Sequence, residues 1–148
     1  MTGDFLAEVE IADFTGLSKK NGVGFNEGGL MVMLQEATAG KEQELLHLGT
    51  FPYYNVGNML TVLSHGRPQY RNDKAWDLDR FLQVERRGNY FYFRTSADGK
   101  VWVNMQGSPF YYPKAAQKSV KLGLYQVTYT PDKGYVSFDN FKLWTPRK

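Results

Sequence analysis

The residues from Asp79 to Met105 contain a two-residue turn, Gly88-Asn89, between two apolar runs rich in β-forming residues. A glycine at the first central position of a two-residue loop is typical of a type II′ β-hairpin. Because such a turn fixes the register of both strands, the other pairs follow by counting outward from it. The predicted pairs are Arg87 with Tyr90, Arg86 with Phe91, Glu85 with Tyr92, Val84 with Phe93 and Leu82 with Thr95.

Alternation of side chains along a strand predicts two unlike faces for this hairpin. The face predicted to join the core carries Leu82, Val84, Phe91 and Phe93. The opposite face is polar and aromatic and carries Gln83, Glu85, Arg87, Tyr90, Tyr92 and Arg94. The hairpin is therefore expected to pack on one side and to meet solvent or a ligand on the other.

A second turn, Ser96-Ala97-Asp98-Gly99, leads into a third strand that ends at Met105. Its register has two readings, because a shift of one residue moves every side chain to the other face. A three-residue loop directs Val101, Val103 and Met105 to the core. It also sets Trp102 beside Tyr92 and Arg94. A four-residue loop instead buries Trp102.

The composition of the 148-residue chain favours a turn-rich β protein. Aromatic residues make up 16%, apolar residues 42%, and glycines number 15. The formal net charge of +3 comes without a cluster of Lys and Arg, so no nucleic-acid partner is expected. No apolar run approaches the roughly 20 residues of a membrane span, and the first residues lack a signal-peptide pattern, so no membrane partner is expected either. Cysteine is absent, which excludes disulfides and thiolate metal sites.

Apolar runs predict the remaining strands, and segments rich in glycine, proline and asparagine separate them. Strands are expected at residues 4–11, 30–35, 45–50, 59–64, 120–128 and 135–144, and irregular structure at 15–29, 65–78 and 106–119. The last strand changes its apolar phase midway, which predicts a β-bulge near Asp139-Asn140. About ten strands at this spacing predict an all-β fold, an antiparallel two-sheet sandwich formed by one domain over residues 1–148.

The motifs RFLQVERRGNYFYFRTSADGKVW, VKLGLYQVTY and GYVSFDNFKLW, with the earlier GDFLAEVEI and GGLMV, occur in an order that resembles the concanavalin A-like lectin/glucanase superfamily. The sequence is most similar to regulation-of-enolase-like domains and to the domain appended to family-43 β-xylosidases. This resemblance implies a concanavalin A-like jelly roll, the four-residue loop that buries Trp102, and a module or fragment of a longer chain.

The resemblance also implies a structural calcium ion, since sandwiches of this superfamily often hold one. Asp139 and Asn140 are the candidate metal ligands, because their side chains supply the oxygen atoms that calcium prefers. Hydrogen bonding at the predicted bulge accounts for the same two residues. No other cofactor is expected.

The sequence lacks the catalytic patterns of related enzymes. Glucanases of the superfamily use a Glu-x-Asp-x-x-Glu strand, which this chain does not contain. A retaining glycosidase needs two carboxyl groups about 5 Å apart, one with a raised pKa, and the spaced acidic pairs lie in polar contexts. These pairs are Glu8/Glu10, Glu42/Glu44 and Asp77/Asp79. His47 and His65 have no second ligand at zinc spacing and are interpreted as core or loop residues.

Aromatic residues that neighbour polar ones give the best case for a ligand site. Flat rings stack on the apolar face of a sugar while Arg, Asn and Asp side chains bond its hydroxyl groups. The predicted contacts come from two irregular segments, with the polar hairpin face as a floor. They are Tyr53, Tyr54, Arg67, Tyr70, Arg71 and Trp76, with Tyr90, Tyr92 and Arg94 below them.

The expected function is therefore that of a noncatalytic carbohydrate-binding or glycosidase-accessory module whose partner is an oligosaccharide or polysaccharide. One alternative is a glycoside hydrolase with a different acid pair, and another is a structural or protein-interaction module. As part of a glycosidase the chain would be secreted or periplasmic, and otherwise it would be cytoplasmic.

Overall fold

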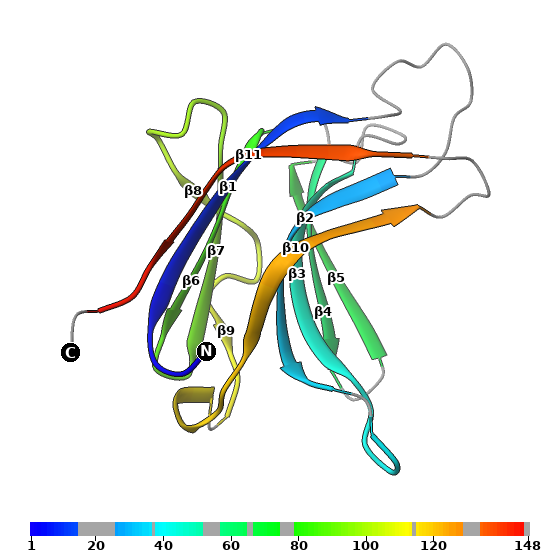
Figure 1. The fold of residues 1–148 in the computed structure, drawn as a ribbon, viewed down its shortest axis with the longest axis vertical. Coiled ribbons are helices and arrows are strands. Elements are labelled where there is room, and N and C mark those ends of the chain that lie inside the picture. Colours follow the sequence, from blue (N-terminus) through cyan, green and yellow to red (C-terminus); the bar gives the residue numbers. More distant parts are fainter. Residues whose placement is uncertain are drawn as a thin grey trace.

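The described residues of the computed structural model are 1–14, 26–36, 38–51, 57–64, 67–74, 79–113, 115–128 and 134–146. They form eleven strands in two antiparallel sheets that pack face to face as a sandwich (Figure 1). The first sheet has the order β11 (Val136–Trp144), β1 (Phe5–Phe14), β6 (Phe81–Arg87), β7 (Tyr90–Ser96) and β8 (Val103–Asn104), and β9 (Phe110–Tyr111) also pairs with β7. The second has the order β10 (Lys121–Thr128), β2 (Asn26–Gln35), β3 (Glu44–Phe51), β4 (Gly57–Ser64) and β5 (Arg67–Lys74). A short 3₁₀ helix, η3 (Ala115–Gln117), precedes β10.

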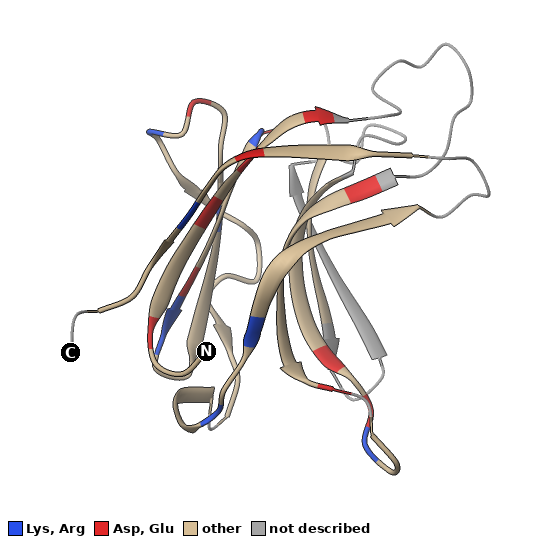
Figure 2. Ribbon diagram, in the orientation of Figure 1, with Lys and Arg blue, Asp and Glu red and all other residues tan. Residues whose placement is uncertain are grey.

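Charged residues of both signs occur along the strands of the first sheet (Figure 2). This mixture agrees with the dispersed charge of the sequence. In the part of the chain that the structure describes, no helix is long and apolar enough to cross a membrane.

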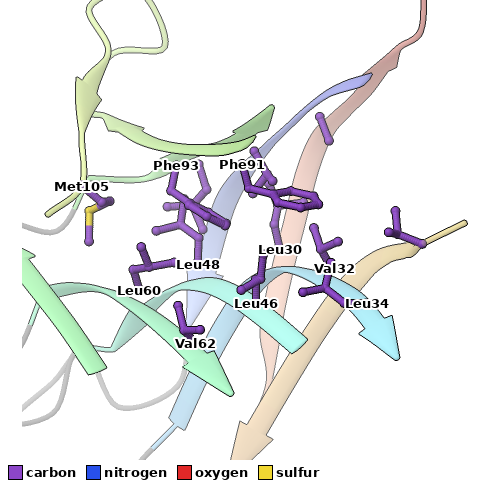
Figure 3. Close-up of a cluster of buried hydrophobic side chains, with 14 of the residues drawn as sticks. Leu30, Val32, Leu34, Leu46, Leu48, Leu60, Val62, Phe91, Phe93 and Met105 are labelled. Atoms are coloured by element: carbon purple, nitrogen blue, oxygen red, sulfur yellow. The ribbon is translucent and has the colours of Figure 1, made fainter. Parts of the chain in front are cut away.

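The hydrophobic core fills the space between the two sheets. Strands β1, β6 and β7 of the first sheet and β2, β3 and β4 of the second contribute alternate residues, because successive side chains point to opposite faces. The buried apolar side chains of the first sheet are Phe5, Ala7, Val9, Ile11, Leu82, Val84, Phe91 and Phe93, and those of the second are Leu30, Val32, Leu34, Leu46, Leu48, Leu60 and Val62. In Figure 3 the rings of Phe91 and Phe93 point toward Leu30 and Leu48 of the opposite sheet. Full burial of a valine, leucine, isoleucine or phenylalanine side chain contributes about 1.5–3 kcal/mol to the free energy of folding.

The hairpin of β6 and β7 has the predicted register. The pairs run without a break from Arg87 with Tyr90 to Leu82 with Thr95. Gly88 has a φ of 57° and the φ of the following residue is not positive, as a type II′ turn requires. The two predicted faces are confirmed as well, since the apolar set is fully buried and the polar set lies on the outside of the sandwich.

The connection after β7 is longer than either loop considered from the sequence. Thr95 pairs with Val103, so residues 96–102 lie between the two strands. The Oδ1 atom of Asp98 accepts hydrogen bonds from two following backbone amides at 2.8 and 3.0 Å, which closes the turn locally. Trp102 is half-buried and lies outside the core cluster, so the prediction that it is buried in the sandwich is wrong.

The segment 65–78 was expected to be irregular, but residues 67–74 form strand β5. Its sequence, RPQYRNDK, is polar and contains Pro68, which argues against an interior strand. β5 is the edge strand of the second sheet and lies beside β4, a position where a proline is tolerated. Strand β2 also begins earlier than expected, at Asn26, because pairing with β3 and β10 extends it through Gly28 and Gly29.

The β-bulge predicted in the last strand is confirmed. The pairing of β1 with β11 shifts between Glu8 and Glu10, and Asn140 has a φ of 52° at that point. The shift sets Phe138 opposite Ile11 and Leu143 opposite Ala7, but Phe141 and Leu143 are 45% and 44% exposed, so the expectation that the apolar residues after the bulge face inward is wrong.

Candidate ligand-binding site

The polar outer face of the first sheet forms a network that bonds to itself. The Glu85 carboxylate accepts hydrogen bonds from Arg87 Nε at 2.6 Å and from Arg94 Nη1 at 2.9 Å. Both guanidinium groups also lie over the ring of Tyr92, at 5.2 and 5.4 Å from its centre. Burial raises the pKa of the Glu85 carboxyl, but the hydrogen bonds and charges of the two arginines outweigh it, and the pKa is lowered.

The same network extends across the sheet. Arg94 Nη1 also donates to Gln83 Oε1 at 2.5 Å, and Gln83 Nε2 donates to Glu8 Oε1 at 2.7 Å. The ring of Tyr90 lies against that of Tyr111, with centroids 5.1 Å apart. The three residues predicted as the floor of a sugar site therefore already contact neighbouring side chains on this face: Arg94 lies over Tyr92, and Tyr90 packs on Tyr111.

The predicted contacts Arg67, Tyr70 and Arg71 lie on one element, strand β5. The backbone pairing sets Tyr70 opposite Thr61 and Arg71 opposite Leu60 of β4, while the side chains of β5 lie outside the described part of the structure. Tyr53, Tyr54 and Trp76 also lie outside the described residues.

The strand ends that precede these aromatic residues are adjacent. β3 ends at Phe51, which pairs with Gly57, and β5 ends at Lys74, which pairs with Asn58. Phe51 and Lys74 are therefore at the same end of the second sheet.

The two predicted groups do not form one site. Tyr90, Tyr92 and Arg94 belong to β7 in the first sheet, and their face points away from the core. Arg67, Tyr70 and Arg71 belong to the second sheet. The hairpin face therefore does not serve as a floor beneath β5, because the packed core separates the two.

The outer face of the second sheet carries a hydrogen-bonded group that the sequence did not single out. Tyr125 donates its hydroxyl hydrogen to Glu27 Oε1 at 2.5 Å. His47 Nδ1 lies 3.1 Å from the same carboxylate oxygen and 2.9 Å from the Tyr125 hydroxyl oxygen. The two rings meet edge to face with centroids 4.8 Å apart. We call these three residues, which come from β2, β3 and β10, the His47 cluster.

The hydrogen-bond network assigns the tautomer of His47. Because the Tyr125 hydroxyl hydrogen is directed at Glu27, the Nδ1 atom faces oxygen lone pairs on both sides and must carry a hydrogen. In the neutral ring Nε2 then has a free lone pair. Among the described residues Nε2 has no hydrogen-bond partner, whereas the Glu27 side chain is fully buried and that of His47 is 13% exposed.

Glycine makes room for this cluster on the sheet surface. A Cβ atom at Gly49 would collide with the Tyr125 hydroxyl and lie 2.8 Å from Glu27 Oε1. At Gly29 a Cβ atom would collide with the backbone carbonyl of Leu48, so β2 and β3 approach closely at this glycine. The absence of a side chain at Gly49 therefore leaves room for Glu27 and Tyr125 over β3.

Thr61 lies next to His47 on the same face, because the two residues pair across β3 and β4. Its side chain is only 4% exposed. Its hydroxyl is the one buried side-chain polar group in the described residues that has no hydrogen-bond partner.

A weak signal of this site was present in the sequence. His47 alternates with the core residues Leu46 and Leu48, which places it on the outer face of a strand. The interpretation of His47 as a lone core or loop residue missed its partners, because Glu27 and Tyr125 lie 20 and 78 positions away in the chain.

The candidate calcium ligands lie at the β11 bulge. Asp139 Oδ1 accepts a hydrogen bond from the backbone amide of Asn140 at 2.7 Å, and Asn140 Nδ2 donates to Glu10 at 2.8 Å. The described residues contain no group of three or more His, Cys, Asp and Glu side chains that could hold a metal ion. The local bonds therefore account for this pair, and a calcium ion stays a prediction.

The fold is that of a β-sandwich of two antiparallel sheets, and one solved structure shares it. That structure is described as a functionally unknown protein from Saccharomyces cerevisiae, with 20% sequence identity and a TM-score of 0.58. The similarity covers 100% of this chain and 72% of that chain. No family model and no curated protein matches the chain. The similarity concerns the fold, and function has to be argued from the site.

Proposed function

We propose that this chain is a noncatalytic carbohydrate-binding module of the concanavalin A-like type, suited to an accessory role beside a glycoside hydrolase. The observation that carries the proposal is the position of β5. Arg67, Tyr70 and Arg71 lie on the edge strand of the second sheet, where Tyr70 has the register position of the outer face and Arg71 that of the core residue Leu60. Trp76 follows two residues after this strand ends at Lys74.

An edge strand with aromatic and basic residues suits a sugar chain. Rings that stack on a pyranose contribute about 1 kcal/mol each, and partly solvated hydrogen bonds add a similar amount. A few such contacts correspond to dissociation constants roughly in the micromolar to millimolar range. The proposed contacts are Tyr53, Tyr54, Arg67, Tyr70, Arg71 and Trp76, and Tyr92 with its arginine partners is left as a structural network.

The test is calorimetric titration of xylohexaose and cellohexaose into three proteins. The wild type is expected to bind at least one of the two, and Trp76→Ala is expected to weaken that binding about fivefold, the loss of one stacking ring. Tyr92→Ala is the matched control, since Tyr92 is an aromatic residue on the other sheet, and it should leave the affinity unchanged.

Two results would count against this proposal. If the protein binds no oligosaccharide of a broad glycan array, the proposed carbohydrate-binding function is wrong. Equal affinity of the wild type and the Trp76→Ala variant, with weaker binding by Tyr92→Ala, would move the site to the first sheet.

A further inference from the structure

We infer that the His47 cluster and Thr61 form a sugar subsite that binds two adjacent hydroxyl groups of a neutral carbohydrate. This inference rests on the proposed function and names the atoms that would recognise the ligand. One hydroxyl would donate to His47 Nε2, and its neighbour would accept from or donate to the hydroxyl of Thr61.

The position of these groups follows from the register of the second sheet. Met31, His47, Thr61 and Tyr70 form one row across β2, β3, β4 and β5. The row therefore connects the His47 cluster with β5, the strand that carries the proposed sugar contacts. A ligand that extends from β5 across the strands would lie beside Thr61 first and His47 next.

His47 is prepared as a hydrogen-bond acceptor before any ligand arrives. Its Nδ1–H is held by Glu27 and Tyr125, which fixes the ring orientation, and in the neutral ring the lone pair is then on Nε2. A ring held in this way loses little conformational freedom on binding, so a hydrogen bond to Nε2 contributes more to affinity.

Thr61 supplies the second group, and its state in the free protein is the strongest observation. A buried hydroxyl without a hydrogen-bond partner lowers the free energy of unfolding by about 1–3 kcal/mol. Valine has the same shape and no hydroxyl, so it would make the free protein more stable at this position. A ligand hydroxyl would provide the missing partner. The unpaired group is thus explained if the row is completed by a bound molecule.

The chemistry of the row selects the ligand class. The Nε2 acceptor of His47 and the hydroxyl of Thr61 are neighbours, and together they match two adjacent hydroxyl groups on a pyranose ring. An ionised Glu27 beneath a neutral His47 would disfavour a phosphate, a sulfate or a uronic acid, because like charges repel. Neutral pentose or hexose units are therefore the expected ligands.

The decisive variant is Thr61→Val, which removes the hydroxyl and keeps the shape. It is expected to raise the melting temperature of the free protein and to weaken binding of the preferred hexasaccharide about tenfold, the loss of one hydrogen bond. Thr50→Val is the matched control, since Thr50 is a buried threonine of the same sheet whose hydroxyl accepts from Asn58 Nδ2 at 3.1 Å. That control should lower the melting temperature and leave the affinity unchanged.

A second variant tests His47 without breaking its cluster. In His47→Asn the amide nitrogen can still donate to Glu27, but the Nε2 acceptor is lost. We expect about a tenfold weaker binding. In ¹⁵N spectra, the imidazole signals that are missing from the His47→Asn variant belong to His47. In the wild type these signals should show a protonated Nδ1. The Nε2 resonance should shift when the sugar is added.

The outcomes separate this inference from the proposed function. If Trp76→Ala weakens binding while Thr61→Val and His47→Asn do not, the module binds sugar and the subsite is wrong. A Thr61→Val protein that is less stable than the wild type would show that the hydroxyl has a structural partner, which also overturns the inference. If no sugar binds to the wild type, both fall together.

Discussion

Arg86 is the largest fully buried side chain of the described core, although it is charged. Its guanidinium donates hydrogen bonds to the backbone carbonyls of Ala115 and Lys118, the latter at 3.1 Å, and lies 6.0 Å from the centre of the Phe91 ring. Burial lowers the pKa of this guanidinium, and the Asp4 carboxylate opposes that shift. Arg86 therefore attaches the segment around η3 to the hairpin of β6 and β7.

Replacing Arg86 should be strongly destabilising. Arg86→Met keeps the apolar stem but leaves buried carbonyls without donors, and we expect a loss of about 3 kcal/mol in the free energy of unfolding. Urea unfolding followed by tryptophan fluorescence would measure this change.

The neighbouring Arg87→Met variant is the control for this experiment. The Arg87 side chain is 61% exposed and its ion pair with Glu85 is on the surface, so little change is expected. A similar stability of both variants would show that desolvation of Arg86 cancels its hydrogen bonds.

At the level of the element, the turn between β6 and β7 depends on one backbone angle. Gly88 has a φ of 57°, and its amide donates to Asp4 Oδ1 at 2.7 Å. A Cβ atom at Gly88 would meet nothing within 4 Å, so only the backbone conformation requires glycine there. The turn and the β1 strand are thus linked through a position that other residues adopt with strain.

The variant Gly88→Ala is expected to lower the free energy of unfolding by about 1 kcal/mol, because a left-handed conformation is costly for alanine. Gly123→Ala is the control, since that glycine of β10 also has open space but no positive φ. It should leave stability unchanged or raise it slightly. Thermal unfolding of both variants decides the question, and an equal effect would mean that φ at Gly88 does not limit the turn.

At the level of the whole molecule, the carboxylates are engaged in separate places. Glu27 bonds to an imidazole and a phenol, Glu85 to two guanidinium groups, and Glu44 to the hydroxyl of Tyr112. A retaining glycosidase needs two carboxyl groups about 5 Å apart around one sugar. Glu27, Glu44 and Glu85 thus bond to separate partners on different strands, and under the proposed function none of them acts as a catalytic acid.

We therefore expect no release of reducing sugar above background when the protein is incubated with xylan, β-glucan or aryl glycosides. The measurement is a reducing-end assay over several hours at high protein concentration. Turnover that disappears when one carboxylate, such as Glu27, is changed to glutamine would establish a hydrolase. Turnover that survives every such change would indicate a contaminating enzyme.

Local patterns were sufficient for much of the fold. The Gly88-Asn89 turn set the register of β6 and β7, since a two-residue loop leaves no freedom in the pairs that follow. The change of apolar phase in the last strand located the bulge at Asn140, although Phe141 and Leu143 beyond it are not buried. Alternation of apolar and polar residues identified the core faces in the same way.

The sequence alone was less informative where contacts between distant segments decide the outcome. β5 is a strand because β4 offers it an edge, although its own residues favour irregular structure. Trp102 was misplaced because the length of the loop after β7 depends on pairing at Val103 and not on the turn motif.

By itself, the sequence determined an all-β sandwich, one hairpin register and the core face of that hairpin, because these follow from periodicity and turn chemistry within short windows. The tertiary structure alone decided which polar groups meet. Glu27, His47 and Tyr125 come from three strands, and the register of the second sheet brings their atoms within hydrogen-bond distance and leaves Thr61 unpaired beside them. A site of this kind is a property of strand order, which no single strand encodes.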